Sequence, residues 1–238
     1  MVRQIIRWSL LLLIWSVMVH TAQAVEQTFY FTSLQYGSID TKRNAPPFAA
    51  DSDYLSAMEN DYGAVSYDPR VEPTVISFEY YRVNGYLGIG FSIDLLSGIA
   101  QNDPPSGVFL LPNYNQEYGF GGGSRVTTET IGLLYGLSLY GRFGFFYPFI
   151  GVGTGNYLSK VEEYLVEGDG TSNYSVVFGE VLEPYYYKWG IRFPSGEYGV
   201  MLSQYYIRAP LTVESRNKTL ELGGVGTFFG FYMEPSHF

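Results

Sequence analysis

Residues 86 to 96 read YLGIGFSIDLL, and the alternation within this stretch decides the fold. Every odd-numbered position from Leu87 to Leu95 is apolar, whereas the positions between them carry glycine, serine and aspartate. Successive side chains of a β-strand point to opposite faces, so this stretch has one apolar face and one polar face. It predicts a β-strand whose two sides meet different environments.

Seven further stretches repeat this alternation. Residues 74–83 connect to the first strand through Asn84-Gly85, a dipeptide typical of two-residue hairpin turns. The other predicted strands are residues 29–39, 131–139, 150–155, 185–193, 198–207 and 219–233. The sequence therefore predicts an all-β fold with eight antiparallel strands.

The connections between these strands alternate in length. Residues 84–85, 140–146 and 194–197 form short connections, whereas residues 40–73, 97–124, 165–175 and 210–218 form long ones. Short turns at one rim and long loops at the other are typical of transmembrane β-barrels. A hairpin inside residues 40–73 would raise the number of strands to ten, but the prolines and charges of that segment argue against it.

The first 24 residues are organised like a secretory signal peptide. Arg3 and Arg7 give a basic start, residues 8–19 are mostly apolar, and Ala22-Gln23-Ala24 matches the small-residue pattern of a cleavage site. An apolar core of about a dozen residues is short of the roughly 20 that a membrane-spanning helix needs. We therefore predict that residues 1–24 are removed on export and that residues 25–238 form one barrel domain.

The composition after residue 24 excludes several kinds of chemistry. All 23 tyrosines and all 17 phenylalanines lie there, but the chain has no cysteine, and of its two histidines only His237 remains. Loss of Arg3 and Arg7 takes the formal net charge from −9 to −11, which argues against nucleic acid as a partner. Disulfides are excluded, and histidine-based chemistry is nearly excluded.

The stretch YPFIGVGTGNY, residues 147–157, and the terminal Phe238 carry a resemblance to a known group. The stretch is similar to the Pro-aromatic-aliphatic-Gly-x-Gly strand of small bacterial outer-membrane β-barrel proteins, the OmpX-like, OmpA-like and opacity-type eight-stranded barrels. The resemblance covers most of the mature chain. It implies a transmembrane up-and-down β-barrel in the outer membrane of a Gram-negative bacterium. One departure is that Glu234-Pro235-Ser236 interrupts the alternation, so the last strand is expected to end near Met233.

Aromatic residues near the strand ends fit this interpretation. Transmembrane barrels carry aromatic girdles at both membrane interfaces. The candidates are Tyr30, Tyr36, Tyr86, Tyr147, Tyr157 and Tyr198.

Four charged residues fall on the polar faces of predicted strands and therefore inside the predicted barrel. They are Glu79, Asp94, Lys188 and Arg192, here named the lumen charge cluster. Charges in a narrow lumen are costly unless they are paired. A buried acid-base site or an ion path is one interpretation, and a group of salt bridges that fills the lumen is the other. We favour the salt bridges because no histidine accompanies these residues.

Two other patterns invite a chemical interpretation. The glycine-rich run from Gly151 is similar to a phosphate-binding loop, but such a loop leads into a helix, whereas here more strand follows. Barrels that modify lipid A resemble one another in using a catalytic serine and a nearby histidine, but His237 lies beyond the last predicted strand. We therefore expect no catalytic residue, no cofactor and no metal site.

The first long connection is acidic, and the first two long connections are aromatic. The carboxylates are Asp51, Asp53, Glu59, Asp61 and Asp68; their spacing matches no dedicated calcium loop, so a solvated acidic surface is expected. The aromatic residues are Tyr54, Tyr62, Tyr67, Phe109, Tyr114, Tyr118 and Phe120. These side chains suit a binding surface, and they suit packing against the barrel rim equally well.

Three classes of function remain open. The first, which we favour, is a structural or surface-interaction protein that acts through its long extracellular loops. The second is a narrow channel for small or lipophilic solutes, and the third, least favoured, is a lipid A-modifying enzyme. The expected partners are outer-membrane lipid and lipopolysaccharide, the barrel-assembly machinery during insertion, and an extracellular ligand or surface partner.

Overall fold

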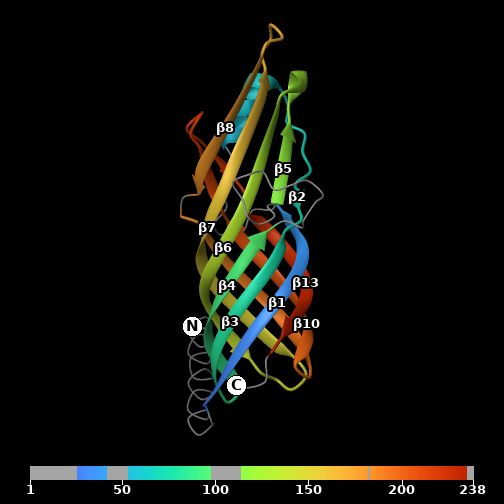
Figure 1. The fold of residues 1–238 in the computed structure, drawn as a ribbon, viewed down its shortest axis with the longest axis vertical. Helices are drawn as coiled ribbons and strands as arrows, with labels where there is room; N and C mark the ends of the chain where they lie inside the picture. Colours follow the sequence, from blue (N-terminus) through green and yellow to red (C-terminus); the bar gives the residue numbers. More distant parts are fainter. Residues whose placement is uncertain (1–25, 42–52, 98–113, 182, 235–238) are drawn as a thin grey trace, which may run out of the picture.

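A computed structural model of the chain describes residues 26–41, 53–97, 114–181 and 183–234. The predicted signal peptide, His237 and Phe238 lie outside the described residues, as do Asp51 and Phe109. The molecule has two parts along its long axis: a barrel at one end and a sheet that rises from the rim at the other (Figure 1).

Eight strands form the barrel. They are β1 (Glu26–Asp40), β3 (Thr74–Asn84), β4 (Leu87–Ser97), β6 (Arg125–Gly141), β7 (Tyr147–Val166), β9 (Tyr185–Ser195), β10 (Tyr198–Arg208) and β13 (Gly224–Met233). Each pairs antiparallel with its neighbours in this order, and β13 pairs with β1, where Tyr36 lies opposite Phe229. The prediction of a closed eight-stranded antiparallel barrel is therefore confirmed, and its last strand ends at Met233.

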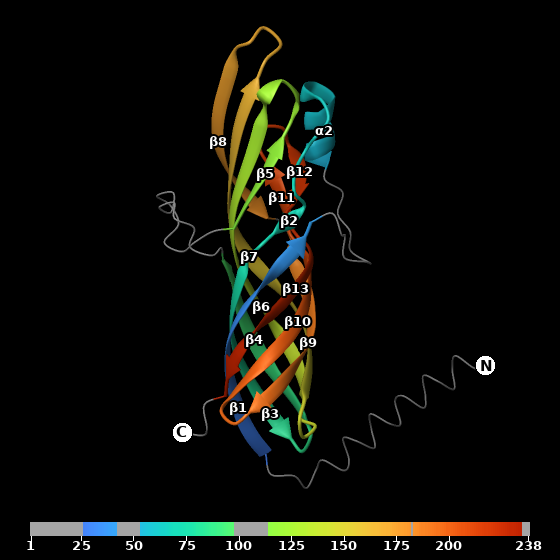
Figure 2. The ribbon, with the colours of Figure 1, turned by 90° about the vertical axis from the view of Figure 1, so that its right-hand side faces the viewer.

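The short connections lie together at one end of the barrel. Gly85 in the β3–β4 turn and Gly196 in the β9–β10 turn have φ angles of 65° and 68°. This left-handed conformation is readily accessible to glycine because it has no Cβ atom. The first strand begins and the last strand ends at this same end of the barrel (Figure 2).

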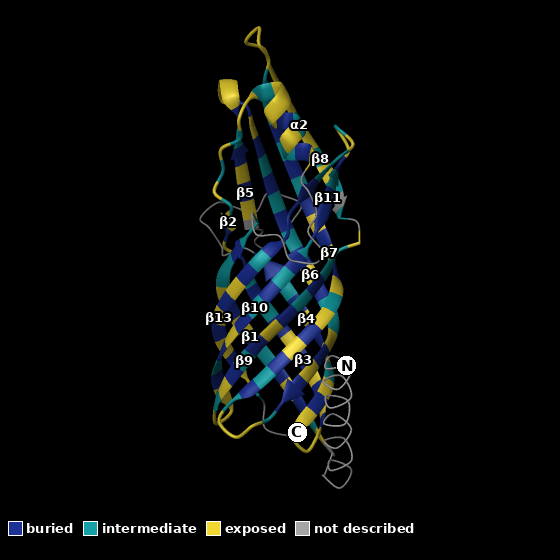
Figure 3. Cartoon of the chain, turned by 180° about the vertical axis from the view of Figure 1, so that it is seen from behind, coloured by how far each residue is buried: buried dark blue, intermediate teal, exposed yellow. Residues whose placement is uncertain are grey.

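The outer wall of the barrel is apolar. Exposed and buried residues alternate along the barrel strands (Figure 3), and the exposed ones include Ile89, Leu137 and Phe231, which are 57%, 60% and 64% exposed. A closed wall with large apolar groups on its outside matches the lipid-facing band of a transmembrane barrel. Among the described residues, no helix has the length and apolar character needed to cross a bilayer.

The aromatic girdle prediction is partly wrong. Tyr30, Tyr86 and Tyr198 are exposed on the outer wall, as is Tyr36. In contrast, Tyr147 and Tyr157 are buried inside, because the alternation of β7 places odd-numbered residues in the lumen.

Beyond the rim, β6 and β7 continue upward and carry additional strands. These are β5 (Tyr114–Gly119), β8 (Ser172–Val181), β11 (Pro210–Val213) and β12 (Lys218–Glu221). They extend the sheet in the order β5-β6-β7-β8-β11-β12, here named the distal sheet. The short strand β2 (Arg70–Val71) pairs with β1, the 3-10 turn η2 (Gly121–Gly123) joins β5 to β6, and helix α2 (Asp53–Tyr62) lies against β12.

The long connections are therefore more structured than the sequence suggested. Segments interpreted as loops contain α2, β5, β11 and the upper parts of β7 and β8. The predicted strand 219–233 is two strands, β12 and β13, separated at Leu222-Gly223. At Gly223 the chain passes close to β10, and a Cβ atom there would lie 2.2 Å from the carbonyl oxygen of Ile207. Glycine avoids this clash because it has no Cβ atom.

Candidate functional site: the lumen charges and the distal sheet

The structure brings all four members of the lumen charge cluster together. Nζ of Lys188 lies 2.9 Å from Oε1 of Glu79 and 2.7 Å from Oδ2 of Asp94, and Arg192 donates to Oε2 of Glu79. All four side chains are almost completely buried. Two carboxylates and two cations therefore neutralise one another inside the barrel, where unpaired charges are unfavourable.

Aromatic rings surround the guanidinium of Arg192. Its central carbon lies 4.3 Å from the ring centroid of Phe149 and 4.6 Å from that of Phe31. Tyr81, Tyr140 and Tyr232 lie within 6 Å of it. Aromatic faces attract cations, so these rings stabilise a charge whose one ion-pair partner among the described residues is Glu79.

Side chains fill the lumen on both sides of this cluster. Towards the short turns lies a buried aromatic group that includes Phe29, Tyr140 and Tyr232. Beside the cluster, Ser203 donates a hydrogen bond to Gln35, and the large rings of Tyr186 and Tyr205 are also buried in the lumen. The small lumen of an eight-stranded barrel has room for little beyond such side chains.

Glycine makes part of this packing possible. Gly136 and Gly153 lie opposite each other on β6 and β7. A Cβ atom on Gly153 would lie 2.8 Å from Cε1 of Tyr186. The small size of these two glycines therefore admits a tyrosine ring into the lumen at this position.

The distal sheet has an open edge along β8. From Ser172 to Gly179, β8 pairs with β7 on one side. On its other side, β11 pairs with only the last two residues of β8, and no other strand of the described chain reaches it. Figure 2 shows β8 at the margin of the distal sheet. This edge therefore offers backbone N–H and C=O groups to an added strand.

The outward face of β8 is apolar as well. Tyr174, Val176 and Phe178 are 63%, 42% and 53% exposed, and they follow one another along this face. Their alternation was present in the sequence, but residues 165–175 were interpreted as a loop. A strand signal in Tyr174, Val176 and Phe178 could have revealed β8.

A buried carboxylate joins helix α2 to the distal sheet. Oε1 of Glu163 on β7 accepts hydrogen bonds from the Tyr54 hydroxyl at 2.6 Å and the Ser215 hydroxyl at 3.0 Å, and Oε2 accepts one from Ser175 at 3.0 Å. Burial, followed by the hydrogen bond to Glu163, raises the pKa of Tyr54 above its ordinary value. The phenol therefore remains protonated and keeps donating to Glu163.

The carboxylates of the first long connection mostly bind neighbouring groups. Asp53 accepts a hydrogen bond from the Thr219 amide at 2.6 Å, and Asp61 pairs with Arg216 at 2.5 Å. Glu59 and Asp68 accept hydrogen bonds from backbone amides nearby in sequence. Within the described ranges, no group of three or more potential metal ligands is found. The carboxylates of α2 thus attach the helix to the β11–β12 hairpin.

Aromatic residues of the long connections pack inward. Tyr54, Tyr118 and Phe120 belong to the buried core beneath the distal sheet, and the rings of Tyr67 and Tyr118 lie 4.9 Å apart. Packing, rather than display on a binding surface, is therefore the role of these residues. On β8, by contrast, Tyr174 and Phe178 are exposed.

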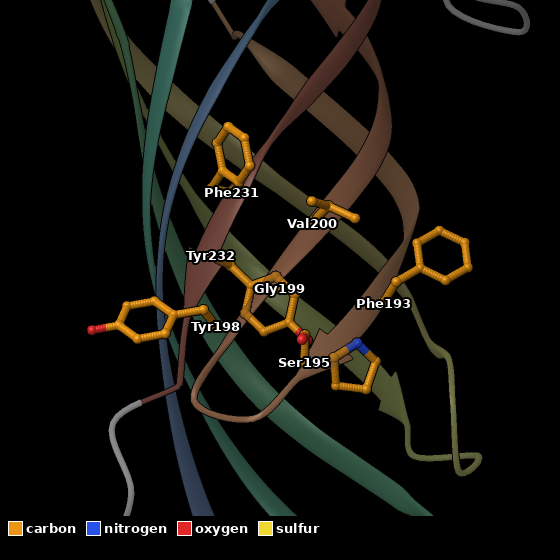
Figure 4. A pocket seen from close by; sticks show the side chains of 8 residues that line it. Phe193, Ser195, Tyr198, Gly199, Val200, Phe231 and Tyr232 are labelled. Atoms are coloured by element: carbon orange, nitrogen blue, oxygen red, sulfur yellow. The ribbon is translucent and has the colours of Figure 1, made fainter.

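One shallow depression lies on the outer wall near the β9–β10 turn. It has a volume of about 780 Å³ and is lined by residues that include Phe193, Pro194, Tyr198 and Phe231 (Figure 4). Its lining is mainly apolar and continuous with the lipid-facing wall. Tyr232, whose ring is buried in the lumen, also borders it.

The closed barrel, its apolar outer wall and its filled lumen define a small outer-membrane β-barrel protein. No family model matches the sequence, and no curated protein matches it.

Two solved structures show a similar fold at very low sequence identity. One is Ail, the attachment invasion locus protein of Yersinia pestis, in complex with the heparin analogue sucrose octasulfate; the TM-score is 0.35 and the identity 10%, over 88% of this chain and 97% of that chain. The other is Neisserial surface protein A, with a TM-score of 0.36 and 8% identity, over 87% of this chain and 98% of that chain. The assignment to the class rests on the strand pairing and the wall of this chain.

Proposed function

We propose that this protein is a surface-interaction protein of the outer membrane, in which the barrel is a closed anchor and the distal sheet binds a partner. The partner is an extended segment that adds to the edge of β8. The observation that carries this proposal is the edge from Ser172 to Gly179, which pairs with no second strand among the described residues.

Edge strands of this kind are unusual among native proteins. Natural sheets protect their edges with lysine, proline, bulges or a covering element, because an open edge pairs with other chains. Residues 172–179 read SNYSVVFG and contain neither a charge nor a proline. Strand addition is an established mode of peptide recognition, in which the backbone gives affinity and alternate side chains give specificity.

The two other classes of function have less support. A channel needs a continuous path, whereas the lumen charge cluster and the packed rings occupy the described interior. A lipid-modifying enzyme has only His237 as a histidine base in the mature chain. We therefore propose a role without catalysis or conduction.

The proposal also includes how the protein is exported and how it is oriented in the outer membrane. We propose that residues 1–24 are a cleaved export signal, that the barrel-assembly machinery inserts the chain, and that the distal sheet faces outward among lipopolysaccharide. On gels, the folded protein should migrate differently before and after boiling. Protease added to intact cells should cleave the β7–β8 turn, residues 167–171. Migration as a soluble periplasmic protein would contradict this arrangement.

Binding is tested with an edge variant and a matched control. Val176→Lys places a charge on the exposed face of β8, whereas Thr127→Lys places the same charge in the same row of that face, two strands away on β6. Proteoliposomes with the wild-type protein should be retained on a surface coated with extended peptides of alternating threonine and valine. Val176→Lys should abolish retention and Thr127→Lys should preserve it. Equal retention of both variants would contradict strand addition at β8.

A further inference from the structure

Exposed carboxylates flank both ends of the open edge. Glu167 and Asp169 lie in the turn that precedes β8, Glu183 follows β8, and Glu214 lies in the turn after β11, the strand that pairs with the last two residues of β8. The eight residues from Ser172 to Gly179 carry no charge, and a further acidic residue, Glu180, follows them directly. The edge is therefore a neutral strand between two negative ends.

Nearby cations do not neutralise these carboxylates. Lys160 pairs with Glu162 and Glu129, Arg216 pairs with Asp61, and Lys218 pairs with Asp53. Within the described parts of the chain, none of the four flanking carboxylates forms an ion pair. The negative potential at both ends of β8 is therefore available to a partner of complementary, positive charge.

We infer that the segment that adds to β8 carries positive charges at both of its ends, around a core of alternating apolar residues. This inference rests on the proposed function and names the chemical class of its partner. The core lies beside Tyr174, Val176 and Phe178, and lysine or arginine side chains on either side of it meet the flanking carboxylates. Eight paired residues span about 26 Å at about 3.3 Å each, so the charges are separated by a short extended segment.

The same charges disfavour a second copy of this chain as the partner. In an antiparallel pair of β8 strands, Glu167 and Asp169 of one copy would lie near Glu183 and Glu214 of the other. A parallel pair would bring identical carboxylates together. Like charges face each other in both arrangements, and like-charge contacts select against a partner.

The test uses the full mature chain in lipid nanodiscs and two synthetic peptides. Both peptides have the same eight-residue core of alternating threonine and valine. One carries two lysines at each end and the other two glutamates. At low salt, the lysine-flanked peptide should bind about tenfold more tightly or better, and added salt should remove most of this preference because it screens exposed charges.

Charge reversal tests whether the flanking carboxylates cause the preference for the lysine-flanked peptide. The double variant Glu167→Lys/Glu214→Lys changes one carboxylate at each end of β8 and should invert the preference towards the glutamate-flanked peptide. Glu117→Lys is the control, because it makes the same change on the exposed face of β5, at the opposite side of the distal sheet. It should leave the order of affinities unchanged.

The outcomes separate this inference from the proposed function. If both peptides bind equally and Val176→Lys abolishes binding of both, strand addition stands and the cationic partner is overturned. If neither peptide binds, the proposed strand addition and the inferred cationic partner are both overturned. If the protein forms dimers that Val176→Lys dissociates, the partner is a second copy and the inference is wrong. The inference is supported if the wild-type protein prefers the lysine-flanked peptide and the double variant Glu167→Lys/Glu214→Lys prefers the glutamate-flanked one.

Discussion

Nζ of Lys188 lies 2.7 Å from Oδ2 of Asp94, although β9 and β4 are separated around the barrel by β6 and β7. This ion pair therefore crosses the lumen and ties together two parts of the wall that share no backbone hydrogen bonds. It therefore adds a side-chain link across the barrel to the backbone hydrogen bonds between neighbouring strands.

Replacing Lys188 with methionine should destabilise the barrel by about 3 to 5 kcal/mol, because it leaves Asp94 buried without a counter-charge. Urea unfolding in lipid vesicles, followed by the fluorescence of Trp189, measures the change. The double variant Lys188→Met/Asp94→Asn should recover part of the loss. Glu129→Gln breaks a 3.8 Å, partly exposed pair with Lys160 and should cost no more than about 1 kcal/mol. An unchanged midpoint for Lys188→Met would show that the pair contributes nothing.

The filled lumen predicts that the purified protein does not conduct ions. Planar bilayers containing the wild-type protein should show no steady current steps, while a porin in the same lipid shows them. Stable conductance in the wild-type protein that changes in Arg192→Ala would contradict the packed interior and restore the ion-path interpretation.

Tyr54→Phe should loosen helix α2 without affecting the barrel. The substitution removes a hydrogen bond to the buried carboxylate of Glu163, which is worth about 1.5 to 3 kcal/mol when one partner is charged. Hydrogen exchange of the α2 amides should become faster, while exchange in β3 and β4 stays the same. Tyr174→Phe removes a hydroxyl from the exposed face of the same sheet and serves as the control. Unaltered exchange in α2 would show that packing alone holds the helix.

Glu221 should titrate above the ordinary range of a glutamate. Burial raises its pKa, and this effect outweighs the opposing hydrogen bonds from the Ala209 and Gly223 amides and the charge of Arg208. The native state therefore holds this proton more tightly than the unfolded chain does. The resulting stability is fully present below the unfolded pKa and is lost as the pH rises through the folded pKa.

The amide chemical shifts of Ala209 and Gly223 report this titration directly, because both amides donate to Oε1 of Glu221. Their common midpoint should lie above the ordinary value of about 4.3. Glu221→Gln should remove the titration from both amides. A midpoint at or below the ordinary value would show that the hydrogen bonds outweigh burial.

The barrel was predictable from the sequence because lipid imposes a strict period of two on its wall. The run from Leu87 to Leu95 and the Asn84-Gly85 turn each specify local geometry without reference to the rest of the chain. The same period placed Glu79, Asp94, Lys188 and Arg192 on inward faces. Their pairing followed from the cost of isolated charges in a closed lumen.

The distal sheet was not predictable in the same way. Its strands bury one face under a helix and meet water on the other, so residues such as Lys160 and Glu162 interrupt the apolar alternation of β7. Helix α2 has a weak sequence pattern, since only Tyr54 and Met58 are buried on it. Its position depends on contacts with Thr219 and Arg216, more than 150 residues away, which no local pattern reveals.

Strand β7 runs without a break from Tyr147, next to the turn at the lower rim, to Val166 beside the upper tip. A pulling force applied to a strand paired with β8 would therefore pass through β7 directly into the membrane anchor. The hydrogen bonds on both sides of β8 would be loaded together along their length, instead of opening one after another. If a partner strand adds to β8 as proposed, the attachment would resist mechanical tension, such as that of flowing liquid, better than its equilibrium affinity alone would indicate.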